Sequence, residues 1–287
     1  MADNLLDKAS ILLTPTAYDN GSMLSIKPEN GDGDFDFQRN SAATRVNAQG
    51  LVENVQIISS ELVSNGNFSE EGTEEVLNGN FSQEGSELVT NGDFATDSDW
   101  SLPSGVTYNS NGYLDCNGSV SSNINQSTSI VSGKQYKVVF EIKNYVSGST
   151  IRIRTGSGSF NDVAISGDNT YTSFITSTDN STFRLYPTNL IGSIDNVSVK
   201  EVGQNWNLGT GWSIGENKIV AVNGDSYGTN QLNVIQINKK YKATYTIEDY
   251  ISGTVNLRMH TLNLQTRNSN GTFTEYFTSV GDHLYIQ

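Results

Sequence analysis

The sequence predicts an all-β protein in which two tandem β-sandwich modules follow a small N-terminal segment. A phrase at residues 134–148 returns at residues 239–253, so that Tyr136 matches Tyr241 at an offset of 105 residues. A repeat of this length indicates a duplicated small domain rather than a solenoid unit. The chain has 27 glycines and only 4 prolines, with polar turn residues between short apolar runs. That pattern favours many short strands, and no long stretch carries a helical stripe.

The composition and charge exclude several classes of function. The chain carries 17 Lys and Arg against 31 Asp and Glu, a formal net charge of −14, whereas nucleic-acid binding requires a basic surface. No apolar stretch has the length of a membrane span, and the N-terminus lacks the features of a secretory signal. The two histidines and the single cysteine, Cys116, have no catalytic or metal-ligand spacing. We therefore expect no nucleic-acid partner, no membrane insertion and no enzymatic activity, with Cys116 a small buried hydrophobe.

Residues 1–60 are predicted to form short strands and turns that hold no core of their own. Asn20 and Asn30 begin turn sequences, while Phe35 and Phe37 alternate with acidic residues. A segment this short and polar buries too little apolar surface to fold alone. We expect it to dock on the next domain, a sister subunit or another protein.

Residues 61–86 are predicted to be an acidic linker built from a short repeat. Each copy has an apolar pair, an Asn-Gly turn and one phenylalanine, and the phenylalanines stand 13 residues apart. Two explanations stay open: the first strand of a domain was duplicated and two copies became a linker, or the copies stack as a strand ladder in an oligomeric stalk. The repeat comprises copy 1 (residues 61–68, ending at Phe68), copy 2 (residues 75–81, ending at Phe81) and copy 3 (residues 87–94, ending at Phe94).

Residues 87–202 are predicted to form a complete β-sandwich of roughly eight strands. Apolar residues alternate with polar ones along residues 136–144, 150–154 and 183–186, and the last strand lies within residues 192–202. The central strand is predicted to turn one face to the core through Tyr136, Val138, Phe140 and Ile142.

Residues 205–287 repeat this pattern but stop before its end. Trp212 is matched here to Trp100, and nothing corresponds to residues 194–199. A sandwich without its final strand exposes an edge that invites pairing. We expect either that the native chain continues past Gln287 or that a neighbour donates the strand.

The opening and closing strands of the first module resemble a known family. Asn91, Gly92, Phe94 and Trp100, with the closing residues 194–199, are similar to the jelly-roll carbohydrate-binding domains related to families 4 and 9. The resemblance covers residues 87–202 fully and residues 205–287 in part. It implies the jelly-roll form of the sandwich and a structural calcium ion held by Asp93, Asp195 and carbonyl oxygens, since calcium takes about six to eight oxygen ligands. The alternative is that Asp195 and Asn196 only make turn hydrogen bonds.

A longer and more specific motif lies within residues 35–53. Its defining residues are Phe35, Phe37, Arg39, Thr44, Arg45, Asn47 and Gly50. The motif is similar to a segment common near the N-terminus of appendage and fibre-like virion proteins of tailed bacteriophages, although Asn40 and Ala42 stand where other residues are common. The resemblance implies a virion component that assembles in the host cytoplasm, and it does not indicate head or tail.

Together these observations favour a bacteriophage fibre or decoration subunit. Its residues 1–60 would bind capsid or tail proteins, its modules would contact host-surface glycans, and fibre analogy suggests a homotrimer. The alternative is a secreted or cell-surface carbohydrate-binding adhesin, or an accessory module of a glycoside hydrolase, although the missing signal counts against it. A depolymerase would need two carboxylates about 5 Å apart, and no recognisable motif holds such a pair.

A candidate ligand face follows from the alternation of two strands. Sugar binding needs aromatic platforms and planar polar groups on one sheet face. The residues predicted to supply them are Trp100, Arg152, Arg154, Arg184 and Tyr186, the last four opposite the core side of their strands. The alternative is an ordinary solvated sheet face.

Overall fold

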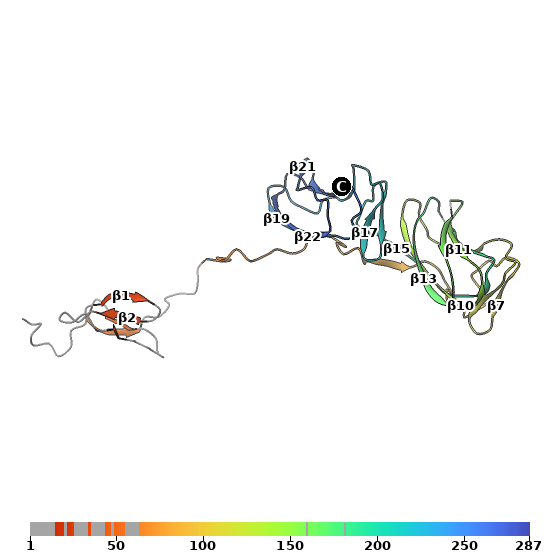
Figure 1. Cartoon of the computed structure of the whole chain (residues 1–287), viewed down its shortest axis with the longest axis horizontal. Helices are drawn as coiled ribbons and strands as arrows, with labels where there is room; N and C mark the ends of the chain where they lie inside the picture. Colours follow the sequence, from red (N-terminus) through yellow and green to blue (C-terminus); the bar gives the residue numbers. More distant parts are fainter. Residues whose placement is uncertain are drawn as a thin grey trace, which may run out of the picture. The chain divides into compact units, whose positions relative to one another are not determined.

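The computed structural model describes residues 15–19, 22–25, 34–35, 44–46, 49–54, 63–158, 160–180 and 182–287. These residues form strands and turns and contain no helix, which confirms the all-β prediction (Figure 1). The chain divides into two compact units, residues 1–72 and residues 73–287.

The N-terminal unit contains short antiparallel strands. Strands β1 (Pro15–Asp19), β2 (Ser22–Ser25) and β3 (Asp34–Phe35) form one sheet in that order. Strands β4 (Thr44–Val46) and β5 (Val52–Asn54) form a hairpin in which Arg45 lies opposite Glu53. Gly50 precedes β5 with a φ of 77°, a conformation that glycine adopts without steric cost.

The first sandwich, here called module 1, extends from β6 to β15. One sheet has the order β13-β10-β15-β8-β7, with β6 also paired to β15, and the other has the order β12-β11-β14-β9. The chain passes repeatedly from one sheet to the other, as in a jelly roll. The strands are β6 (Glu84–Glu87), β7 (Val106–Asn109), β8 (Tyr113–Asn117), β9 (Ile124–Ser127), β10 (Gln135–Ser147), β11 (Thr150–Thr155), β12 (Asn161–Ala164), β13 (Asn169–Thr176), β14 (Thr182–Thr188) and β15 (Ile191–Val202).

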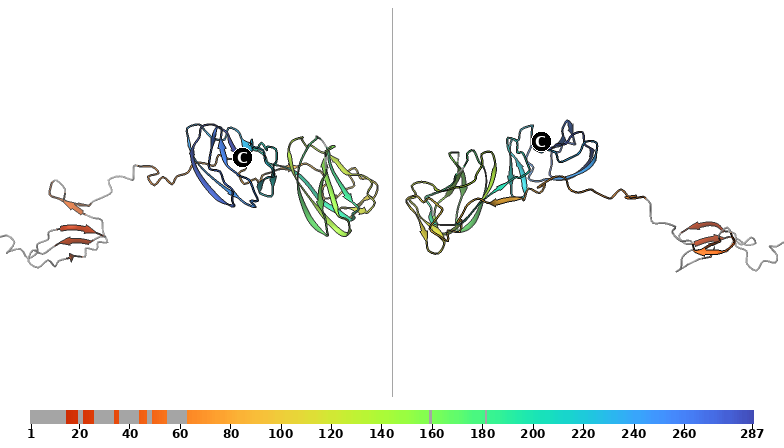
Figure 2. Two further views of the ribbon diagram at one scale, coloured as in Figure 1. Left: turned by 45° about the horizontal axis from the view of Figure 1, so that its top comes forward. Right: turned by 180° about the vertical axis from the view of Figure 1, so that it is seen from behind.

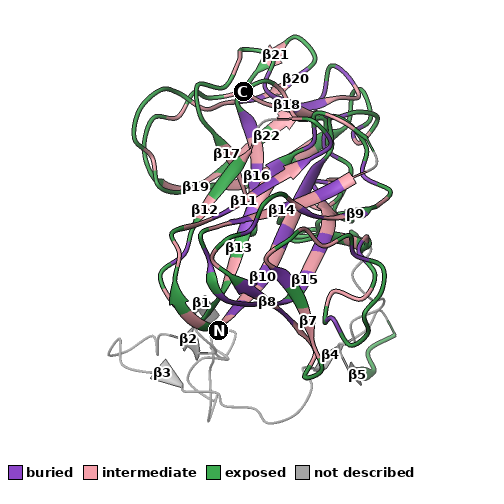
Figure 3. Cartoon of the chain, turned by 90° about the vertical axis from the view of Figure 1, so that its right-hand side faces the viewer, coloured by how far each residue is buried: buried purple, intermediate pink, exposed green. Residues whose placement is uncertain are grey.

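The alternation in the sequence builds the core of module 1. The inward residues of β10 that the sequence predicted are at most 1% exposed. They pack against the equally buried inner faces of β11, β14 and β15, which appear purple in Figure 3. Burial of these side chains supplies about 1.5–3 kcal/mol each, the main favourable term in folding.

The strands of the second sandwich, module 2, are drawn in Figure 2, and they repeat the strand order of module 1 except for its closing strand. The buried core of module 2 is smaller than that of module 1. Its sheets have the orders β18-β23-β20-β21, β19-β22 and β16-β17. The strands are β16 (Trp212–Gly215), β17 (Lys218–Ala221), β18 (Thr229–Gln231), β19 (Lys240–Ile247), β20 (Leu257–Met259), β21 (Leu262–Asn263), β22 (Gly271–Thr278) and β23 (Leu284–Ile286).

The duplicated phrase makes the same hydrogen bonds in both modules. The backbone N–H of Val131 donates to the Tyr136 hydroxyl at 2.8 Å, and that of Gln236 donates to the Tyr241 hydroxyl at 2.8 Å. Near the other end of the phrase, the hydroxyls of Tyr145 and Tyr250 each donate to a glycine carbonyl three residues later. Each of the four repeated tyrosines therefore holds a turn through its hydroxyl.

Module 2 lacks the strand that closes module 1. In module 1, β15 lies between β10 and β8 and pairs antiparallel with both. In module 2, the strands equivalent to β10 and β8 are β19 and β17, and among the described residues they pair only with β22 and β16. The inward side chains of β19 are accordingly only half-buried, whereas those of β10 are fully buried. The prediction of an incomplete second module is confirmed.

Copy 3 of the short repeat is the first segment of module 1. The backbone N–H of Thr90 donates to Gln126 Oε1 at 2.8 Å, and Gln126 Nε2 donates to the Thr90 carbonyl at 2.9 Å. The indole N–H of Trp100 donates to the Asn91 carbonyl at 3.0 Å. The Phe94 ring packs on the Trp100 ring with centroids 5.5 Å apart.

Copy 2 makes the same set of contacts with module 2. The N–H of Leu77 donates to Gln231 Oε1 at 3.0 Å, and Gln231 Nε2 donates to the Leu77 carbonyl. Trp206 Nε1 donates to the Asn78 carbonyl at 3.1 Å, and its ring lies 5.1 Å from the Phe81 ring. Module 1 is thus inserted into module 2 after the first segment of module 2.

These contacts correct the match between Trp212 and Trp100. Trp206 takes the place of Trp100, because both donate their indole N–H to the carbonyl of the repeat asparagine. Trp212 instead opens the β16–β17 hairpin, where it corresponds to Val106 at the start of β7. The sequence match between Trp100 and Trp212 rested on the serine that follows each of them.

Candidate functional site

The outer face of sheet β12-β11-β14-β9 gathers four of the five residues predicted for the ligand face. Arg152 lies opposite Tyr186 across β11 and β14, and Arg154 lies opposite Arg184 in the next row. All four are partly exposed. The residues that alternate with them, Ile151, Ile153, Phe183 and Leu185, are fully buried beneath the sheet.

A loop aromatic that the sequence reasoning missed completes this face. The Phe160 ring lies beneath two guanidinium groups, with Arg152 Cζ 4.2 Å and Arg154 Cζ 4.5 Å from its centroid. It also lies 6.5 Å from the Tyr186 ring. Phe160 follows a Gly-Ser-rich loop just before β12, and a single aromatic residue in such a loop was the available signal.

The charges on this face are only partly neutralised. Arg152 Nε contacts Asp162 Oδ1 at 3.0 Å, and Arg184 Nη1 donates to the Gly156 carbonyl. The Nε of Arg154 is buried and has no hydrogen-bond partner among the described residues. The face therefore concentrates positive charge on a chain of net charge −14.

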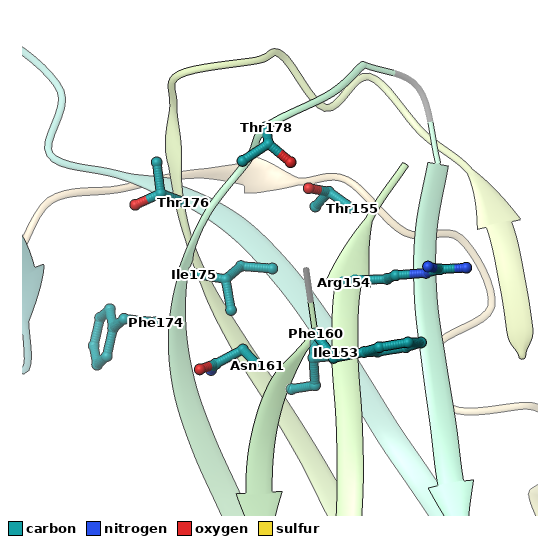
Figure 4. Close-up of a pocket in the computed structure, with 9 residues that line it drawn as sticks. All are labelled: Ile153, Arg154, Thr155, Phe160, Asn161, Phe174, Ile175, Thr176 and Thr178. Carbon is teal, nitrogen blue, oxygen red and sulfur yellow. The ribbon is translucent and has the colours of Figure 1, made fainter. Parts of the chain in front are cut away.

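A small pocket opens at the sandwich edge beside this face (Figure 4). Its volume is about 130 Å³, and its walls come from β11, the start of β12, β13 and the turn after β13. Figure 4 shows the side chains of Arg154 and Phe160 lying one above the other at this edge. Pockets that enclose a small ligand usually measure about 300–1,000 Å³, so binding here would use the open face rather than the pocket.

Trp100, the fifth predicted residue, is not on the face. Its side chain is 7% exposed and packs between Phe94 and Phe183, with the Phe183 centroid 6.4 Å away. The prediction for Trp100 is wrong, because its ring fills the core under copy 3 and its indole N–H is used to hold that copy.

The two aspartates predicted as calcium ligands have other partners. Asp195 is 5% exposed, and its Oδ2 lies 2.7 Å from Lys143 Nζ while its Oδ1 accepts the Asn196 N–H at 2.7 Å. The hydrogen bond to Asp195 raises the pKa of Lys143. Asp93 is exposed, and its nearest partner is the Ala95 N–H at 3.4 Å.

These contacts do not fit a calcium site. The ammonium of Lys143 already neutralises Asp195 and occupies the oxygen that a cation would need. Within the described ranges, no cluster of three or more His, Cys, Asp or Glu side chains is placed to hold a metal ion. The ion pair with Lys143 therefore disfavours Asp195 as a calcium ligand, and the assignment of Asp93 stays a prediction.

The residues of the N-terminal motif are described only in part. Phe35 ends β3, Thr44 and Arg45 begin β4, and Gly50 lies between β4 and β5. Beside Gly50, the side chains of Leu51 and Val52 are exposed. Three further motif residues, Phe37, Arg39 and Asn47, lie outside the described residues.

Cys116 is buried on β8, as the sequence predicted. Burial, with a smaller contribution from Asp115, raises the pKa of its thiol to about 12. The thiol therefore stays protonated at physiological pH and is a poor nucleophile.

The described part of the chain contains no helix with the length and apolar character of a membrane span.

No family model matches the chain, and no curated protein matches it. Several solved structures do. One described as CBM4, a carbohydrate-binding module, is 16% identical, with 39% of this chain and 99% of that chain covered and a TM-score of 0.29. The CBM22-1–CBM22-2 tandem domain of Xyn10C from Paenibacillus barcinonensis is 12% identical, with 72% and 90% covered and a TM-score of 0.30.

A phage protein is also among the matched structures. The enzymatically active domain of tailspike protein 4 from bacteriophage CBA120 is 20% identical, with 40% of this chain and 21% of that chain covered and a TM-score of 0.28. Identities and TM-scores this low carry no function from those proteins to this chain.

Proposed function

We propose that this chain is a structural component of a bacteriophage virion, a head or tail fibre or decoration subunit that adheres to host-surface glycans. The observation that carries the binding role is the outer face of sheet β12-β11-β14-β9, where the Phe160 ring adjoins the Tyr186 ring and two guanidinium groups. The virion role rests on the resemblance of residues 35–53 to phage appendage proteins. By analogy with fibres, the subunit assembles as a homotrimer.

The chemistry of the face suits an acidic sugar. The ring of Tyr186 offers a flat apolar surface against which the C–H groups of a sugar ring pack. Arg152 and Arg154 present planar donor forks that match a carboxylate in two-point hydrogen bonding. Within the described residues, Arg152 pairs with Asp162 and Arg184 interacts electrostatically with Asp179, while Arg154 forms no salt bridge, so the face favours glycans that carry carboxylates.

Substitution of Tyr186 or Arg152 by alanine is expected to weaken glycan binding about tenfold or more, because truncation of a binding anchor costs about 2 kcal/mol. The measurement is a glycan array followed by calorimetry on the best acidic oligosaccharide. Tyr276→Ala is the matched control, since Tyr276 is a tyrosine 76% exposed on β22 of module 2. Binding that survives both Tyr186→Ala and Arg152→Ala contradicts the site.

The virion role is tested separately. Mass spectrometry of purified particles is expected to find this chain, and antibody labelling in electron micrographs locates it on the head or the tail. An adhesin or an accessory module of a glycoside hydrolase would be absent from particles. The exposed side chains of Leu51 and Val52, at the start of β5, support docking of this region on another protein.

A further inference from the structure

The three copies of the short repeat adopt one local conformation. The phenylalanine N–H donates to the asparagine carbonyl in each turn, at 2.8 Å for Phe68, 3.1 Å for Phe81 and 3.2 Å for Phe94. The turn asparagines Asn65, Asn78 and Asn91 have φ values of 51°, 49° and 50°. Copy 1 therefore holds the shape that copies 2 and 3 use when they bind a sandwich.

The sites that bind copies 2 and 3 have the same structure. In each module, a buried glutamine makes paired hydrogen bonds with one backbone unit of the copy, and a tryptophan donates to the carbonyl of its asparagine. The phenylalanine of the copy then packs on that tryptophan. Val76, just before this backbone unit in copy 2, also packs on the core of module 2.

Copy 1 differs from copies 2 and 3 in the exposure of its phenylalanine. Phe68 is 90% exposed, whereas Phe94 is 1% exposed and Phe81 is half-buried. A single exposed aromatic residue is unremarkable in itself. Here, however, it belongs to a preformed docking segment whose two sister copies both cover a tryptophan.

We propose that copy 1 is the first segment of a third β-sandwich of the same type. The binding sites in modules 1 and 2 are already occupied by copies 3 and 2. Copy 1 therefore fits a further sandwich that has a Trp and a Gln in the positions of Trp206 and Gln231. Copies 2 and 3 occur in the opposite order to the completion of their sandwiches. Copy 3 belongs to module 1, which follows it directly, whereas copy 2 belongs to module 2, whose other strands come after module 1. In the third sandwich, the backbone of Ser64 would meet the glutamine, and the carbonyl of Asn65 would accept from the tryptophan.

A deletion tests whether copy 1 is competent to dock. Removal of residues 69–81 joins Phe68 to Ser82 and brings copy 1 into the place of copy 2 with unchanged spacing. The chain that lacks only residues 69–81 is expected to have the same Tm of module 2 and the same Trp206 fluorescence emission as the unaltered chain. The same deletion with Phe68→Ala is expected to lower that Tm by about 10 °C or more, because the aromatic contact is lost.

A second arm tests docking between molecules. The full-length Phe81→Ala variant has a weakened copy 2, and a synthetic peptide of residues 61–72 is added to it. The peptide is expected to raise the Tm of module 2 as its concentration increases, and the Phe68→Ala peptide is expected to leave it unchanged. The proposal is overturned if copy 1 stabilises module 2 in neither arm, or if Phe68→Ala makes no difference in either.

Discussion

Extension of the chain by a copy of residues 187–202, placed directly after Gln287, is expected to raise the Tm of module 2 by about 10 °C or more. The register of the two modules fixes this junction. Phe183 lies opposite Gln126, and Leu284 lies opposite the equivalent Gln231. Gln287 therefore holds the position of Tyr186, and the added segment begins where β15 is approached in module 1.

The physical reason is that, among the described residues, β19 pairs with a strand on one edge alone. The added strand would pair with β19 and β17 as β15 pairs with β10 and β8. It would also bury the inward side chains of β19, which are now half-exposed, and each buried side chain contributes about 1.5–3 kcal/mol. The inward residues of β19 are Tyr241, Ala243, Tyr245 and Ile247.

Calorimetry and hydrogen exchange measure the effect of the extension. The backbone amides of β19 that face the open edge should exchange more slowly in the extended chain. The control carries the same extension with serine in place of the residues copied from Ile194, Val197 and Val199. It is expected to leave the exchange rates of the β19 amides unchanged. Equal exchange at β19 with and without the apolar extension would contradict the proposed register.

The second expected result is that Gly92→Ala destabilises module 1 by about 3 kcal/mol, while Gly79→Ala in the equivalent turn is tolerated. In module 1 the closing strand passes directly over Gly92, whose carbonyl accepts the Val197 N–H at 2.8 Å. A Cβ at Gly92 would penetrate the Val197 carbonyl oxygen. A Cβ at Gly79 would meet only Val76, with Cγ1 at 3.3 Å.

Urea unfolding of both variants checks this contrast. Because the two glycines occupy the same turn of copies 3 and 2, the local conformational cost of alanine is matched, and the difference reports the closing strand. In the extended chain, Gly79→Ala should also become destabilising, as the new strand then covers it. Equal stability of the two single variants would show that the closing strand does not press on this turn.

Much of the fold follows from the amino-acid pattern alone. Strict alternation in residues 136–144 decided which side chains of β10 face the core, because a strand has only two faces. The offset of 105 residues placed Tyr241 and Tyr250 correctly, and the missing match to residues 194–199 predicted the open edge of β19. The same alternation placed Arg152, Arg154, Arg184 and Tyr186 on one outer face.

The tertiary structure alone decided the pairings between distant segments. Periodicity gives the face of a residue but not its partner, so it could not tell that Trp100 fills a core or that Lys143 neutralises Asp195. For the same reason the sequence pattern matched Trp212 rather than Trp206 to Trp100. It also predicted that copy 2 is part of a linker. Copy 2 belongs to module 2 because Gln231 and Trp206, more than a hundred residues away, satisfy its backbone groups, and only the folded chain brings them together.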